Sequence, residues 1–123
     1  MDWKLELVAV PVTDVDRAIA FYVDRAGFVL DHDHRVSEDL RFVQLTPPGS
    51  ACSIALGTGI VQTTPGSAQG LQLVVHDIEA ARAELVDRGL EVSEVERLPW
   101  GAFVHFTDPD GNGWAVQEIP PRG

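Results

Sequence analysis

Apolar and polar positions follow the same order in both halves of this chain. In the first half, an apolar segment at 5–12 leads to Asp14 and then to about 15–25, where apolar residues recur every three or four positions. This spacing predicts a strand followed by an amphipathic helix. Asp14 is a typical N-cap, and Gly27 is a typical C-terminal stop. Three short strands are predicted after the helix, over 28–33, 39–46 and 51–57.

The order returns in the second half. Aligning Asp14 with Asp77 places Arg25 on Arg88. One extra residue in the first copy, Ala26, then brings Gly27 onto Gly89. The pattern predicts a strand at 71–76, a helix over about 78–88, and strands at 90–97, 102–107 and 113–119. Both copies are therefore predicted to fold as a βαβββ module.

Two such modules predict an α+β fold in a single domain. One helix cannot cover a four-stranded sheet on both faces. Two modules side by side therefore leave a concave, eight-strand surface that can enclose a ligand. We divide the chain into a first module at 1–57, a linker loop at 58–69, a second module at 70–119 and a tail at 120–123.

Composition narrows the range of partners. The chain has 123 residues, of which 45% are hydrophobic, and a formal net charge of −10. Nucleic acid and anionic membranes are unsuitable partners because phosphate binding requires a basic face. The sequence contains no apolar run long enough to span a membrane. Cys52 is the single cysteine and cannot form an internal disulfide, so we expect a cytoplasmic location.

Three segments carry a resemblance to a known family. They are VPVTDVDRAIAFYVDRAGF, VVHDIEAARAELVDRG and FTDPDGNGWAVQE. In this order they resemble the vicinal oxygen chelate superfamily, which includes glyoxalase I, bleomycin-resistance proteins and extradiol dioxygenases. The resemblance implies an incomplete eight-strand barrel around a cavity. It also implies a homodimer, by side-by-side packing or by exchange of modules, and either arrangement can complete the cavity.

Enzymes of this superfamily usually hold a divalent metal on the first and last strands of each module. The corresponding positions here are Leu7, Ala55, Gly70 and Ala115. A metal needs oxygen, nitrogen or sulfur ligands, and none of these side chains has one. We therefore expect neither a metal nor another cofactor.

Strand alternation predicts what lines the cavity instead. The repeat aligns Phe42 with Phe103 and Gln44 with His105, and all four are predicted to point inward. Trp100 either overhangs the cavity mouth or covers a sheet edge. The predicted ligand-binding residues are Phe42, Gln44, Ser53, Gln72, Trp100, Phe103, His105 and Gln117.

Aromatic and amide side chains are typical of a pocket for an organic molecule. We favour a protein that binds a small hydrophobic or aromatic molecule without a metal, similar to the bleomycin-resistance branch. One alternative is a metal-independent lyase or isomerase with His105 as general acid and base. Another is a metal-dependent glyoxalase- or dioxygenase-type enzyme with relocated ligands.

Overall fold

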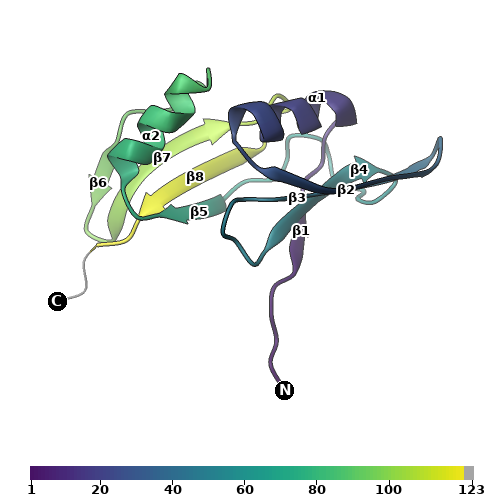
Figure 1. Ribbon diagram of the computed structural model, residues 1–123, viewed down its shortest axis with the longest axis horizontal. Helices are drawn as coiled ribbons and strands as arrows, with labels where there is room; N and C mark the ends of the chain where they lie inside the picture. The colour runs from purple at the N-terminus through teal and green to yellow at the C-terminus, as the bar shows by residue number, and fades with distance from the viewer. Residues whose placement is uncertain (121–123) are drawn as a thin grey trace.

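Two four-stranded sheets carry the fold, and each follows one copy of the repeat. The computed structural model describes residues 1–120, so the predicted tail lies outside it except for Pro120. The strand orders are β1-β4-β3-β2 and β5-β8-β7-β6 (Figure 1). The pairs β1–β4 and β5–β8 are parallel, and the other neighbouring pairs are antiparallel. The predicted α+β fold of two βαβββ modules is confirmed, and the two sheets do not close into one barrel.

The elements have the following bounds. The first module contains β1 (Leu7–Ala9), α1 (Val15–Ala20), η1 (Phe21–Arg25), β2 (Val29–Ser37), β3 (Leu40–Thr46) and β4 (Ser53–Thr58). The second contains β5 (Leu71–Val75), α2 (Ile78–Asp87), β6 (Glu96–Leu98), β7 (Gly101–Thr107) and β8 (Gly113–Glu118). Neither α-helix within residues 1–120 has the length and apolar character needed to cross a membrane.

Strand register agrees with the alignment of the two copies. Gln44 lies opposite Ala55 in the first sheet, and His105 lies opposite Ala115 in the second. The aligned pairs therefore occupy equivalent places in their sheets. Both helices begin as predicted, because the Asp14 carboxylate accepts from the Arg17 N–H at 3.0 Å and Asp77 accepts from Ala80 at 3.1 Å.

The extra residue of the first copy is absorbed in the helix. Its last turn, η1, is a π-helical turn in which the Ala26 N–H donates to the Phe21 carbonyl at 3.1 Å. A π turn spans one more residue than an α turn, so it accommodates an insertion without moving the elements on either side. The second helix has no such turn and no extra residue.

Each module contacts the other where the two helices end. Arg25 Nη1 donates to the carbonyl oxygen of Arg88 at 2.9 Å and passes so close to Gly89 that a Cβ there would collide with it. In return, the Arg88 guanidinium lies 3.0 Å from where a Cβ on Gly27 would be. Both glycines have positive φ, which suits a helix end. The aligned Arg and Gly residues therefore pack against one another as a pseudo-symmetric pair.

One hydrophobic core serves both modules. The two helices lie on the same side of the sheets (Figure 1), and their buried residues join those of both sheets. The most completely buried apolar members are Val10, Ala18, Tyr22, Val43, Leu45, Leu56, Ile78, Val104 and Val116. The modules are therefore packed as a single body.

A buried carboxylate joins the modules at the centre of this core. The Tyr22 hydroxyl of the first module donates to Asp108 Oδ2 of the second at 2.7 Å, and Trp114 Nε1 donates to the same hydroxyl at 3.0 Å. The amide of Asn112 also donates to Asp108 Oδ2, at 2.8 Å. Burial and the adjacent carboxylate raise the pKa of Tyr22 well above its usual value.

The turn at 108–112 carries this carboxylate and makes further contacts with the first module. Asn112 Nδ2 donates to the Pro11 carbonyl at 2.8 Å, and Thr13 Oγ1 donates to Asp110 at 2.7 Å. Asn112 Oδ1 accepts from the Ala68 N–H at 3.0 Å, which holds the linker. The turn thus fixes the first module, the linker and the second sheet relative to one another.

The predicted strand at 90–97 is wrong over most of its length. Only Glu96–Leu98 pair with β7. The carbonyl groups of Val92 and Ser93 accept from the side chain of Arg82 in α2 instead of entering the ladder. Much of the β7 edge beyond Phe103 consequently has no neighbouring strand.

Replacing Tyr22 with Phe should destabilise the fold. The variant removes a donor to buried Asp108 and leaves Trp114 Nε1 without its acceptor, which costs about 1–3 kcal/mol. Urea denaturation measures the difference. Ser67→Ala, which removes an exposed hydroxyl, should change stability by no more than about 0.5 kcal/mol. Equal stability of Tyr22→Phe and the native protein would contradict the role given to this hydroxyl.

The free energy of unfolding should also fall at alkaline pH because of the Tyr22 hydroxyl. The folded protein holds the phenolic proton of Tyr22 more tightly than the unfolded chain does. The resulting stability is complete below about pH 10 and is lost above it by up to about 1.4 kcal/mol per pH unit. Tyr22 is the single tyrosine, so absorbance at 295 nm should show its ionisation only as the protein unfolds. In Tyr22→Phe the slope of stability against pH should be shallower, and an unchanged slope would assign the effect elsewhere.

Candidate functional site

Each sheet has one face turned away from the helices, which we call its open face. On β3, Val43 and Leu45 enter the core, so Phe42 and Gln44 lie on the open face. On β7, Val104 and Phe106 enter the core, and Phe103 and His105 lie on the open face. These orientations match the predicted ones.

Strand β2 adds two histidines to the open face of the first sheet. Its register places His32 opposite Gln44 and His34 opposite Phe42. The imidazole rings stack, with centroids 5.6 Å apart and an angle of 21° between planes. Both histidines are exposed, and neither is among the predicted ligand-binding residues that they adjoin.

A salt bridge behind the sheet holds this strand. Arg41 donates from Nε and Nη2 to the two oxygens of Asp33 at 2.9 and 2.8 Å, and from Nη1 to Asp16 at 2.9 Å. These hydrogen bonds lower the pKa of Asp33. The bidentate geometry fixes β2 against β3, and with it the positions of the two histidines.

The polar residues of the first open face bond to one another. Gln44 Nε2 donates to Ser53 Oγ at 3.2 Å, and Ser53 Oγ lies 2.7 Å from Thr46 Oγ1. Ser53 is buried and Phe42 is half-buried. The predicted residues Gln44 and Ser53 are therefore joined directly, and Phe42 lies on the same face.

The second open face has a chain of amides that ends on a tryptophan. Gln72 Nε2 donates to Gln117 Oε1, and Gln117 Nε2 donates to the Trp100 carbonyl at 3.0 Å. Trp100 lies in the turn before β7 with 63% of its surface exposed. The rings of Phe103 and His105 stack at 6.4 Å with 14° between planes. All five predicted residues of this module thus gather on one face or at its end.

The four family metal positions do not fit a divalent ion. Ala55 lies between Ala9 and Gln44 in the first sheet, and Ala115 lies between Gln72 and His105 in the second. Leu7 and Gly70 likewise lack a donor side chain. Within residues 1–120, three His, Cys, Asp or Glu side chains nowhere come together as a possible metal site. The residues present therefore provide no ligand set of the family type.

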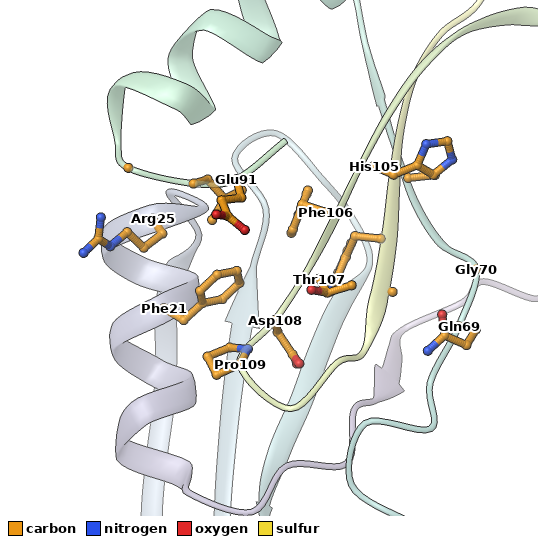
Figure 2. Close-up of a pocket in the computed structure, with 15 residues that line it drawn as sticks. Phe21, Arg25, Gln69, Gly70, Glu91, His105, Phe106, Thr107, Asp108 and Pro109 are labelled. Atoms are coloured by element: carbon orange, nitrogen blue, oxygen red, sulfur yellow. The ribbon is translucent and has the colours of Figure 1, made fainter. Parts of the chain in front are cut away.

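A hollow of about 690 Å³ opens at one end of the second sheet (Figure 2). This volume is within the range for pockets that hold small organic molecules. Gly70 and Ala115, two of the family metal positions, line it together with His105. Its other lining residues are Phe21, Arg25, Gln69, Gly89, Leu90, Glu91, Phe106, Thr107, Asp108, Pro109, Gly113 and Trp114.

The hollow reaches around the edge of β7 that faces away from β8. His105 points to the side of the strand on which Gln69 and Gly70 lie, whereas Phe21 and Glu91 lie on the other side with Phe106 (Figure 2). Beyond Phe103 no strand of the described residues lies along this edge, because β6 pairs only with Gly101–Phe103. Ser93 is the residue that contacts the backbone of His105 there, with its N–H and its hydroxyl.

The predicted site residues are only partly brought together. His105 alone among the eight lines this hollow. Phe42, Gln44 and Ser53 lie on the other sheet. Strand alternation could not find Phe21, Arg25 or Glu91, because they come from a helix end and from the loop after α2. The pairing of Gly27 with Gly89 could have indicated that the helix ends meet near a site.

Comparison with known proteins places this geometry in a family. The family model of the glyoxalase/bleomycin resistance protein/dioxygenase superfamily matches residues 4–116. The chain belongs to this superfamily. The solved structure of TnmS3, an antibiotic binding protein from Streptomyces sp. CB03234, is similar with a TM-score of 0.87 and 34% identity. The match covers 97% of this chain and 98% of TnmS3.

Two further relatives agree. A glyoxalase/bleomycin resistance protein from the same Streptomyces is 36% identical, with a TM-score of 0.80 over 93% of this chain and 99% of that one. YetH of Bacillus subtilis, an uncharacterised protein, is 28% identical and covers 94% of this chain and 98% of its own. The resemblance seen in the sequence motifs is thereby confirmed along nearly the whole chain.

Replacing Gln117 with Leu should release the turn that holds Trp100. The variant keeps a side chain of similar size but removes the two hydrogen bonds of the Gln117 amide, one with Gln72 and one with the Trp100 carbonyl. Hydrogen exchange at the amides of Trp100 and Gly101 should quicken because the turn loses its anchor. The matched variant Gln69→Leu should leave these amides unchanged. Unaltered exchange in Gln117→Leu would show that the turn is held by other contacts.

Proposed function

We propose that this protein binds a small hydrophobic or aromatic organic molecule without using a metal ion. The observation that carries the proposal is the hollow at the end of the second sheet. It includes two family metal positions, yet these are Gly70 and Ala115, and the same hollow is lined by Phe21, Phe106 and Trp114. Such a lining favours an apolar molecule over an ion.

The relatives support the same class of function. TnmS3 is an antibiotic binding protein, and this chain shares its fold and about a third of its residues. Fold alone does not determine function. The support therefore comes from the likeness together with the lining of the hollow.

A metal-independent lyase or isomerase is the second candidate. His105 is exposed and lines the hollow, so its imidazole could exchange a proton with a bound molecule. Its nearest ring neighbour is Phe103, and no hydrogen bond joins the imidazole to a carboxylate within residues 1–120. Because a general base is usually oriented by such a partner, we favour binding. A metal enzyme with relocated ligands is disfavoured because no three His, Cys, Asp or Glu side chains within residues 1–120 come together as a possible metal site.

The proposal includes a homodimer in the cytoplasm. The open faces of both sheets carry aromatic and amide side chains, and within residues 1–120 neither sheet covers the open face of the other. A second copy, packed side by side or exchanging modules, would enclose Phe42 and Gln44 against Phe103 and Gln117. Sedimentation equilibrium should then give twice the monomer mass of 13.4 kDa.

Thermal-shift screening of aromatic natural products tests the binding function. Bound molecules should raise the unfolding temperature in proportion to the logarithm of their concentration, equally before and after dialysis against EDTA. Phe21→Ala should weaken binding about tenfold or more because it removes an aromatic ring from the wall of the hollow. Val36→Ala, at an exposed position of the β2–β3 hairpin, should not.

Several outcomes would contradict the proposal. A screen without hits would argue against a ligand of this class. Binding that is lost after EDTA and restored by one equivalent of a divalent metal would favour relocated ligands. Turnover of a bound compound that His105→Ala abolishes would favour the enzyme.

A further inference from the structure

The hollow contains a carboxylate that no group within residues 1–120 neutralises. Glu91 follows the end of α2 and is exposed to the hollow. Figure 2 shows its carboxylate pointing inward, on the side where Phe21 and Phe106 lie. Within residues 1–120, Glu91 makes neither a side-chain hydrogen bond nor an ion pair, whereas Glu79, Glu84 and Glu94 each have an arginine partner.

The other charged groups of the hollow are directed elsewhere. Arg25 donates to the carbonyl of Arg88, and its guanidinium points outward in Figure 2. The Asp108 carboxylate accepts from Tyr22 and Asn112, and from the N–H of Asp110. His105 points to the opposite side of β7. Glu91 therefore sets the charge on the aromatic side of the hollow.

Aromatic surface lies next to this carboxylate. Phe106 is buried and stacks on Trp114, with ring centroids 5.9 Å apart. Phe21 lies at the wall, 6.3 Å from Phe106 between centroids. A ring face attracts a cation, and a carboxylate beside it strengthens that attraction. The combination suits a molecule with an apolar body and a positive charge.

We propose that Glu91 makes the hollow selective for organic cations, such as a protonated amine attached to an aromatic body. This inference rests on the proposed binding function and specifies its ligand class. The formal net charge of −10 acts in the same direction, because a strongly acidic protein attracts cations from a distance. Glu91 would supply the local part of the selectivity, in contact with the ligand.

A matched pair of probes tests this inference. 1-Naphthylmethylamine is cationic at pH 7, and 1-naphthalenemethanol is its neutral counterpart of nearly the same shape. Titration calorimetry on the full chain should show the amine binding about three- to fivefold more tightly, as expected of a partly exposed ion pair. Raising the NaCl concentration should reduce this preference by screening.

Two variants separate the local carboxylate from the overall charge. Glu91→Gln should abolish the preference for the amine and leave the affinity for the alcohol unchanged. Glu38→Gln changes the net charge by the same amount at the turn of the β2–β3 hairpin, and it should keep the preference. Near-ultraviolet circular dichroism checks that both variants retain the native fold.

The binding results separate a wrong role for Glu91 from a wrong proposed function. If amine and alcohol bind native protein equally, or the preference persists in Glu91→Gln, the role of Glu91 is wrong while aromatic binding stands. If neither probe binds at concentrations where both remain soluble, the hollow is not an aromatic site and the proposed function loses its main support.

Discussion

The hydrogen bond between Tyr22 and Asp108 is the interaction on which the arrangement of the modules depends. A carboxylate is costly to bury unless donors surround it, and Asp108 is 4% exposed. Its donors come from both halves of the chain, so the carboxylate is satisfied only when the first helix is docked on the second sheet. Docking brings Phe21 beside Phe106, which forms one wall of the hollow. The site is thus a consequence of how the two modules are joined.

Much of the fold could be predicted because it depends on local patterns. Asp14 and Asp77 cap helices wherever an apolar stripe follows, and β3 and β7 alternate in the expected way. The alignment of Gln44 with His105 required only that the two copies share a register. These features follow from backbone geometry and burial, which the order of apolar and polar residues encodes directly.

The hollow could not be predicted in the same way. It depends on where β6 ends, and that in turn depends on Arg82 binding the carbonyl groups of residues 92 and 93. A side chain that competes with a strand ladder leaves no periodic signal. Glu91 lies in a loop, where alternation has no meaning. The sequence therefore predicted the kind of residues on the open faces but not the edge where they meet a cavity.

The π turn of η1 has a consequence for how the chain uses its duplication. The wider turn belongs to the first helix alone, and the residue of the second helix aligned with Phe21 is Glu84, which pairs with Arg88. An aromatic wall therefore reaches from the first module to the second sheet without a matching wall in return. With this one-residue insertion, the two modules contribute different parts of the hollow: the first supplies the aromatic wall, and the second supplies the sheet beneath it. The hollow at the equivalent place in the repeat, lined by Gly27, Phe28, Glu84 and Arg88, is accordingly smaller, at about 240 Å³.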